Sequence, residues 1–554
     1  MSKGGFRGGK GGISQLDVLC ALAPDLGCLN FIRAFKNADT LACSQLLVWV
    51  ACTCCAGLAG LLFYRAAAKL MAHDEGLYVS RAMLMLHSGD WIHPWSTPHH
   101  KPPGFYWLQA ILIQTFGASE FLSRMPAALA ATASMVLVFR LGYVLNLIVE
   151  GFVGALFLST SYLFFFYGRL AVPDTILVML VLIMVLGLIV RPTASARTQA
   201  WHATCAGLAL GLMLLVRGPV AFTLALGMLP YLIATRHSLL KERLVGCATG
   251  LVIGSIPIGL WLAATMPTQG FGVINQMVAF AGAIATETRH GNGPFYYFWN
   301  IGANAFPWSV AAIFGGWKLL HGHDRPQIAL LVGFPLVYLL VLSAASTHLP
   351  HYALPLYPFV GILAAIAVVH YADRRLPHLI QASVSVAVGV VLVLAMLLYH
   401  ADIAKLYGMP AIILAGCLAT GFILAAAFAF RRGPGSVFLS PAISMVLLLS
   451  LTFSGAGLLN IVGNVNPALK AAIQSEAVRD ALANPVDFIG LTGKESVMAL
   501  IYSPHWGDQV PNVASYDGSG PAWINRDIFV ELDGRAKIIA DLGQSLLITP
   551  IKQP

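Results

Sequence analysis

Charged side chains stand directly beside apolar runs at two places early in the chain. The carboxylates Asp74 and Glu75 are adjacent, and because like charges repel, a nearby cation or a functional demand usually accompanies such a pair. Lys101 is followed by Pro102 and Pro103, which restrict the backbone and would present the lysine in a fixed direction. These residue types suit acid–base chemistry next to a phosphate.

Each of these residues also has an ordinary explanation. A lysine beside aromatic residues is common at a membrane interface, and acids at a helix start are favoured by the helix dipole. Asp174 follows Pro173 and would ordinarily cap a helix. The segment after Glu75 has apolar residues at helical spacing, which predicts an amphipathic helix lying in the interface.

Further polar residues follow later apolar runs, and the topology predicted below places all of them on one face of the membrane. They are Arg169, Asp174, Arg217, Glu287, Arg289, His290, His348, His351 and Tyr352. Charged residues held near a membrane commonly mark substrate pathways. The set joins cations suited to a phosphate with carboxylates suited to base chemistry, which favours a cleft for a phosphate-bearing lipid.

The composition is that of an integral membrane protein. Of the 554 residues, 58% are hydrophobic and only 10% are charged, whereas a soluble domain carries about 25% charged residues. The mean hydropathy is +0.76. A net charge of +9 is typical of basic cytoplasmic loops here and does not indicate nucleic-acid binding. Apolar runs predict about thirteen transmembrane helices, at 43–63, 125–145, 147–167, 174–190, 201–216, 219–235, 246–265, 295–317, 327–345, 353–371, 380–399, 409–430 and 436–462.

Lysine and arginine in alternate connections predict the orientation of these helices, with the N-terminus in the cytoplasm. Pairs such as Arg374–Arg375 and Arg431–Arg432 mark the inner turns. The nine cysteines all lie in the inner tail or in predicted spans, so no structural disulfide is expected. The predicted domains are a cytoplasmic tail over 1–42, a transmembrane domain over 43–463 with outer loops at 64–124 and 266–294, and a periplasmic domain over 464–554.

The last of these domains is expected to be a small α/β domain outside the membrane. The stretches SVMALIYSPHW (496–506) and AKIIADLGQSLLITP (536–550) predict strands. The stretch PALKAAIQSEAVRDALAN (467–484) predicts an amphipathic helix. The fold class predicted for the whole chain is therefore an α-helical polytopic membrane protein with a small C-terminal α/β domain.

The ordered motifs resemble the GT-C superfamily of glycosyltransferases that use polyprenyl-phosphate-linked sugars. The similar branches are the protein O-mannosyltransferase-like family and the aminoarabinose transferases that modify lipid A. The thirteen spans and the outer C-terminal domain resemble the aminoarabinose branch in particular. The resemblance rests on DEGLY at 74–78, GDWIHP at 89–94, KPPGFYWLQA at 101–110, FGASEFLSRMPAALAA at 116–131, GRLAVPD at 168–174, LLVRGP at 214–219, PFYYFWNIGANAFPW at 294–308 and STHLPHYALPLYP at 346–358.

This resemblance implies an inverting transferase in which Asp74 is the general base for the acceptor hydroxyl. It implies that Lys101 contacts the lipid phosphate and that Asp174 is a second acid at the rim of the active site. Further donor-binding positions would be Arg217, Arg289, His351 and Tyr352. Acceptor-binding or supporting positions would be Glu75, Tyr78, Arg169 and His348.

The chain departs from the family pattern at two positions. Leu77 stands where many relatives have arginine, and His100 stands where they often have glutamate. A zinc ion held by His100, His290 and Glu287 would be chemically reasonable; a hydrogen-bonded histidine cluster is the other interpretation. The departures leave the sugar open, while Asp74 and Lys101 remain in place for transfer.

The expected partners are a polyprenyl-phosphate-linked sugar, membrane lipids, and an acceptor that is a glycolipid, a glycan or a protein hydroxyl; no nucleic acid is expected. The expected location is the inner membrane of a bacterium. Two other functions stay open, namely a protein O-mannosyltransferase-type enzyme and a non-catalytic lipid-binding or transport protein. Against transport, the polar residues gather at one face rather than at the bilayer midplane.

Overall fold

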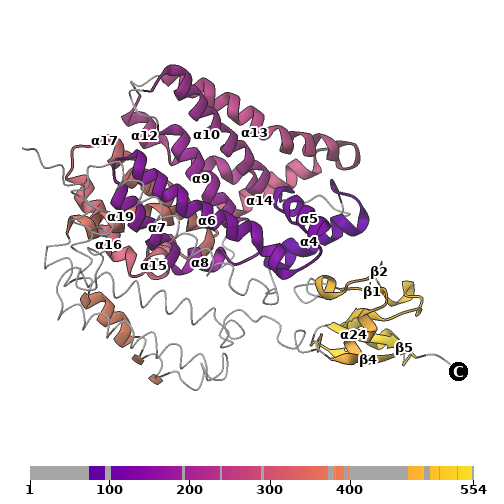
Figure 1. Cartoon of the computed structure of the whole chain (residues 1–554). Helices are drawn as coiled ribbons and strands as arrows, with labels where there is room; N and C mark the ends of the chain where they lie inside the picture. The colour runs from indigo at the N-terminus through magenta and orange to yellow at the C-terminus, as the bar shows by residue number, and fades with distance from the viewer. Residues whose placement is uncertain are drawn as a thin grey trace, which may run out of the picture.

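A bundle of apolar helices, with a small sheet domain near the C-terminus, makes up the computed structural model (Figure 1). Among the described residues, five helices are long and apolar enough to cross a membrane, so the chain is a multi-pass membrane protein. Outside the described residues lie the predicted spans 43–63 and 436–462 and, apart from residue 423, the span 409–430. The described residues are 74–93, 101–189, 194–236, 240–287, 292–371, most of 380–398, residue 423 and, with short gaps, 472–551.

The bundle is built from the following elements in chain order. They are α4 (Asp74–Ser88), α5 (Gly104–Phe116), α6 (Glu120–Val144), α7 (Ile148–Thr160), α8 (Tyr162–Tyr167), α9 (Asp174–Leu188), α10 (Ala196–Arg217), η1 (Gly218–Val220), α11 (Ala221–Leu226), α12 (Leu229–Ala234), α13 (Leu240–Gln269), α14 (Gly272–Thr286), α15 (Tyr296–Asn304), α16 (Trp308–Leu320), α17 (Arg325–Ile328), the π-helical turn η2 (Ala329–Gly333), α18 (Phe334–Ala344), η3 (Pro350–Leu356) and α19 (Tyr357–His370).

Helix α9 lies at the centre of the bundle. Nearly all of its side chains are buried, as expected for a helix that is apolar on every side. Helices α6 and α10 pack against it, and α7 and α16 pack against α19. Because α9 begins at Asp174 and α10 ends at Arg217, this packing brings the two charged residues to the same end of the bundle.

Glycines allow α10 and α13 to pack closely along their length. A Cβ atom at Gly250 would lie 1.9 Å from the carbonyl oxygen of Thr204, and one at Gly211 would lie 2.5 Å from the backbone of Gly254. Small residues spaced four apart permit this approach in membranes, where close packing rather than water drives helix association. The contact fixes α10, and therefore Arg217 at its end.

Three predicted spans are interrupted, so their prediction as single helices is wrong. The span 147–167 breaks at Ser161, whose hydroxyl donates to the carbonyl of Phe157. The span 295–317 breaks at Pro307, because proline has no N–H to continue the helix. The span 219–235 breaks at Gly227 and Met228. Apolar composition continues across all three breaks, which hid them from the sequence.

The two long predicted loops contain helices. Helices α4 and α5 lie in 64–124, and the predicted amphipathic helix after Glu75 is present as α4. Helix α14 occupies much of 266–294. Of the cysteines, Cys205 and Cys247 are free thiols, and the others lie outside the described residues.

The C-terminal domain is a five-stranded mixed sheet in the order β2-β1-β3-β5-β4. Strand β1 runs parallel to β2 and β3, and β5 runs antiparallel to β3 and β4. Its elements are α24 (Glu476–Leu482), β1 (Val486–Ile489), β2 (Trp506–Val510), η5 (Val513–Ser515), β3 (Ala522–Asn525), α26 (Arg526–Phe529), η6 (Val530–Leu532), β4 (Ala536–Asp541) and β5 (Ser545–Pro550).

The predicted strands at 536–550 are present as the β4–β5 hairpin. The prediction of a strand over 496–506 is wrong, because residues 499–502 are helical and β2 begins only at Trp506. The indole N–H of Trp506 is shared between the carbonyls of Leu500 and Ser503, which ties this turn to the strand. Helix α24 is shorter than predicted and is capped by Ser475.

Candidate active site

An ion pair joins the beginning of α9 to the end of α10. Nη2 of Arg217 lies 2.8 Å from Oδ1 of Asp174, and their side chains are only 16% and 6% exposed. The N-cap of α9 is Pro173, which makes no side-chain cap, and Asp174 binds the arginine. Since a buried carboxylate needs a partner, the two side chains hold each other where α9 begins and α10 ends.

Three further side chains lie close to this pair. Nη1 of Arg217 donates to the hydroxyl of Tyr78 on α4 over 3.4 Å. Nζ of Lys101 lies 4.7 Å from the centre of the Tyr78 ring, and the guanidinium carbon of Arg217 lies 5.9 Å from the Tyr352 ring. Such distances allow cation–π attraction. Two cations and one carboxylate therefore meet around Tyr78.

A second buried ion pair backs this group and holds the start of α4. Oε1 and Oε2 of Glu75 accept from Nε and Nη2 of Arg124 over 2.7 and 3.1 Å. Oε1 also accepts the backbone N–H of Ala171 over 2.9 Å. Glu75 therefore links α4 to α6 and to the loop that precedes α9.

Asp74 and Arg169 lie next to this second pair. Asp74 is the first residue of α4, so the bonds of Glu75 fix the backbone that carries it. Burial, followed by the charge of Arg124, lowers the pKa of Arg169 to about 10. Arg169 is therefore still protonated at neutral pH and adds a positive charge near that of Arg124.

The turn that contains His351 and Tyr352 is held from two sides. Nδ1 of His351 lies 3.0 Å from the hydroxyl of Tyr167. The hydroxyl of Tyr338 donates to the carbonyl of Tyr352 over 3.1 Å. These contacts position the Tyr352 ring beside Arg217.

His348 lies deeper, among aromatic rings. Its ring centre is 5.5 Å from that of Tyr297 and 6.1 Å from that of Tyr296. Its carbonyl accepts from Nδ2 of Asn292. Neither ring nitrogen of His348 has a hydrogen-bond partner among the described residues, so His348 stands apart from the Asp174–Arg217 group.

The remaining predicted site residues belong to the segment after α14 and to the one before Lys101. Glu287 is exposed, and its backbone carbonyl accepts from the hydroxyl of Thr347. Arg289, His290 and His100 lie outside the described residues. Among the residues that are described, no three histidine, cysteine or acidic side chains come together in a way that would hold a metal ion. The zinc site stays a prediction.

Several residues at this end of the bundle were not singled out from the sequence. Arg124 is the most important, because it holds Glu75; Arg81 donates to the hydroxyl of Tyr106 on α5. The only available signal for Arg124 was a single arginine in a largely apolar segment, far along the sequence from Asp74 and Glu75. Tyr167 and Tyr338 stand inside apolar runs, where a tyrosine usually indicates packing.

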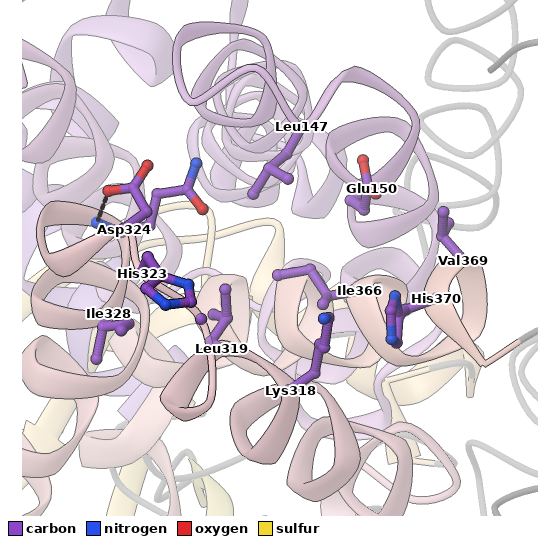
Figure 2. Close-up of a pocket in the computed structure, with 12 residues that line it drawn as sticks. Leu147, Glu150, Lys318, Leu319, His323, Asp324, Ile328, Ile366, Val369 and His370 are labelled. Atoms are coloured by element: carbon purple, nitrogen blue, oxygen red, sulfur yellow. Dashed lines mark hydrogen bonds between the residues drawn. The ribbon is translucent and has the colours of Figure 1, made fainter. Parts of the chain in front are cut away.

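A cavity of about 230 Å³ lies at the opposite end of the bundle (Figure 2). It is formed where α16 and α19 end and α7 begins, and the 14 residues of α19 separate it from the Tyr352 turn by about 20 Å. Glu150, Lys318 and Asp324 line it together with apolar side chains. Asp324 caps α17 by accepting the N–H of Gln327, so this cavity does not belong to the candidate site.

Comparisons with known proteins agree with this architecture. Residues 100–261 match the sequence model of the dolichyl-phosphate-mannose-protein mannosyltransferase family. The undecaprenyl phosphate-alpha-4-amino-4-deoxy-L-arabinose arabinosyl transferase 2 of Proteus mirabilis is 25% identical over 61% of this chain and 63% of its own length. The corresponding transferase of Edwardsiella ictaluri is 29% identical over 53% of this chain and 54% of its own length. The chain thus spans less than two thirds of the length of these relatives.

The fold is shared with a solved structure over nearly its whole length. ArnT from Cupriavidus metallidurans, in a crystal structure bound to undecaprenyl phosphate, superposes with a TM-score of 0.73 at 18% identity, covering 91% of this chain and 98% of that one. The chain therefore has the fold of that multi-pass membrane protein. In sequence, the chain is similar to aminoarabinose transferases and, over residues 100–261, to the mannosyltransferase family.

Proposed function

We propose that this protein transfers a sugar from a polyprenyl-phosphate carrier to a hydroxyl acceptor at the periplasmic face of a bacterial inner membrane. The observation that carries the proposal is the convergence of Lys101, Arg217 and Asp174 around Tyr78, beside the start of α4. The names of the relatives support it, since they are transferases of undecaprenyl phosphate-linked aminoarabinose. The ArnT complex with undecaprenyl phosphate supports the donor class.

In the proposed reaction, the acceptor oxygen attacks the anomeric carbon from the face opposite the phosphate. The bond between that carbon and the phosphate oxygen breaks, and its electron pair leaves with the polyprenyl phosphate. Asp74 takes the proton of the acceptor hydroxyl as general base. The configuration of the anomeric carbon is inverted.

The arrangement of charges suits these roles. Asp74 would act from the first residue of α4, where the bonds of Glu75 hold the backbone. Lys101 and Arg217 would stabilise the charge that develops on the leaving phosphate. Asp174 would keep the guanidinium of Arg217 in position.

Other predicted residues would surround this centre. Arg289 would supply a third cation to the phosphate, and His351 and Tyr352 would line the donor site. His348 would support the same turn. A zinc ion, if held by His100, His290 and Glu287, would lie on the segments next to this site.

The basic connections support an orientation with the N-terminus in the cytoplasm and the candidate site on the periplasmic side. With this orientation, 1–42 would be a cytoplasmic tail, 43–463 the transmembrane domain and 464–554 a periplasmic domain. The cavity near Glu150 would then face the cytoplasm.

The chemical class of the acceptor distinguishes the main proposed function from a protein O-mannosyltransferase-type enzyme. A lipid A-like glycolipid or another cell-envelope acceptor fits the aminoarabinose-transferase-like relatives, whereas a protein hydroxyl fits the mannosyltransferase family whose sequence model matches residues 100–261. Both reactions use the same donor chemistry. A non-catalytic lipid-binding or transport protein would need no residue in the role of Asp74.

The test compares membranes from a strain that lacks the gene after complementation with wild type, Asp74→Asn or Lys101→Ala. Lipid, glycan and protein fractions are read by mass spectrometry for an added sugar. Wild type is expected to add one, and each variant to lose on the order of 100-fold or more of the transfer rate. The fraction that gains the sugar identifies the acceptor.

The matched controls are Glu150→Gln and Lys318→Ala, which remove the same types of charge at the opposite end of the bundle. Both should transfer at the wild-type rate at equal expression. Unchanged transfer by Asp74→Asn and Lys101→Ala would refute the site. Absence of transfer by wild type across a panel of donors, with lipid binding intact, would favour the non-catalytic alternative.

A further inference from the structure

The C-terminal sheet has two apolar faces with different neighbours. Because side chains alternate along a strand, Ala522 and Ile524 of β3 point to one face and Trp523 points to the other. The face of Ala522 and Ile524 packs against Val513 and Leu532 within the domain. The face of Trp523 packs against Val478 and Leu482 of α24 and against residues of the helix bundle.

This second face shares one hydrophobic core with the helices that carry the candidate site. Figure 1 shows the domain lying beside α4 and α5. All of the core side chains are buried, so the contact is closed to solvent. The domain contributes Val478, Leu482, Val486, Phe488, Ala499, Trp523, Leu542 and Leu547. The helix bundle contributes Val79, Ala82, Ala110, Ile113 and Ala171.

An aromatic contact at the edge of this core joins the two parts directly. The ring of His87 on α4 lies 5.1 Å from the indole of Trp506 on β2. Phe488 packs edge-on against the other side of Trp506 at 5.8 Å. Since the indole N–H is also held by backbone carbonyls of its own domain, Trp506 presents a fixed surface to α4.

Helix α4 therefore contacts both the transmembrane bundle and the C-terminal domain. Tyr78 and Met85, seven residues apart, belong to the core of the transmembrane bundle. Val79 and Ala82, three apart, belong to the core shared with the domain. At about 100° per residue these two stripes are neighbours on the helix, so the bundle and the sheet contact adjacent faces of α4.

We infer that the C-terminal domain is a positioning element of the active site, acting on α4 through the contact of Trp506 with His87. This inference rests on the proposed function, because α4 carries Asp74 and Glu75. Without the sheet, the stripe of Val79 and Ala82 would have to find another apolar surface, and α4 could shift. Misplacement of a reacting group by about 1 Å can cost a rate of order 100-fold.

The test uses the full-length protein in lipid nanodiscs and the variant His87→Ala. His87 is exposed apart from its contact with Trp506, so its replacement leaves the buried core intact. We expect kcat to fall by about tenfold, KM for the donor to stay unchanged, and hydrogen exchange of α4 to become faster. His87→Phe, which keeps an aromatic ring against Trp506, should restore kcat.

Two controls isolate the positioning role. His321 packs against Trp317 at the opposite end of the bundle with rings 4.4 Å apart, so His321→Ala removes the same kind of contact and should leave kcat unchanged. Trp506→Ala removes the contact from the domain side and should give the same loss of kcat as His87→Ala. Combining the two substitutions should add little, because both remove one interaction.

The outcomes separate this inference from the proposed function. If wild type transfers sugar and His87→Ala and Trp506→Ala leave kcat and the exchange of α4 unchanged, the positioning role is refuted and the transferase function stands. If only KM for the acceptor rises, the domain binds acceptor and does not position α4. If wild type transfers nothing, the proposed function itself fails.

Discussion

The two ends of the helix bundle differ in the burial and the partners of their carboxylates. At the end marked by Asp174, carboxylates are buried against arginines, as in the pair of Glu75 with Arg124. At the opposite end, Asp324 is exposed and caps a helix, and Lys318 is only partly buried at the edge of a cavity. The buried acid–arginine pairs thus lie at one end. The buried arginine of the opposite end, Arg243, donates to the carbonyl of Leu188 and not to a carboxylate.

The difference indicates where function constrains the fold. Taking two charges out of water is expensive, and a buried ion pair often contributes little net stability. Such pairs are weak evidence for a stabilising role and stronger evidence for a site where charge must be held in place. By contrast, charges beside Glu150 can remain hydrated, and their loss should matter little.

The largest expected effect is on catalysis by Arg217. Arg217→Ala should lower the rate of sugar transfer about 100- to 1,000-fold, because it removes a cation aimed at the leaving phosphate. The measurement is initial transfer rate in nanodiscs at saturating donor. Arg140 is the matched control, since its guanidinium lies 5.0 Å from the Tyr143 ring near the end of α6. Equal losses for Arg217→Ala and Arg140→Ala would remove the distinction between the ends.

The next effect concerns stability at Glu75. Glu75→Gln leaves Arg124 buried without its carboxylate partner, and breaking a buried pair in this way costs about 3–5 kcal/mol. Glu150→Gln should change the free energy of unfolding by less than about 0.5 kcal/mol. Thermal unfolding of both variants in the same detergent makes the comparison.

A double substitution sharpens this result. Glu75→Gln together with Arg124→Met removes both charges, so it should recover part of the lost stability. Transfer activity should not return with it if the pair serves to place α4. Full recovery of both stability and activity would show that the ion pair has no part in the site.

The sequence predicted some of the residues that form these contacts but not all of their partners. Asp174, Arg217 and Lys101 were predicted as site residues because charges beside apolar runs are conspicuous, and the structure brings them together around Tyr78. Arg124 was missed because its pairing depends on packing between α4 and α6, which no local pattern encodes. The contact of the C-terminal domain with α4 was missed for the same reason.

The breaks in the helices were equally hidden. The spans were predicted from the length of apolar runs, and an apolar run looks the same whether it forms one helix or two. Ser161 and Pro307 therefore had little effect on the predicted spans. The π-helical turn at Ala329–Gly333 leaves no signal in hydropathy either. Site residues were thus easier to predict than the geometry that joins them.

The smallest expected effect tests whether the tyrosines near Arg217 also contribute to sugar transfer. Tyr338→Phe removes one hydrogen bond to the carbonyl of Tyr352, worth about 0.5–1.5 kcal/mol. Since Tyr352 packs beside Arg217, we expect transfer to fall about two- to tenfold by the same conversion. Tyr371→Phe, just beyond α19 at the opposite end, should have no effect on transfer. Equal transfer rates for both variants would show that only the charged residues matter for transfer. A loss found only in Tyr338→Phe would show that the supporting tyrosines matter as well.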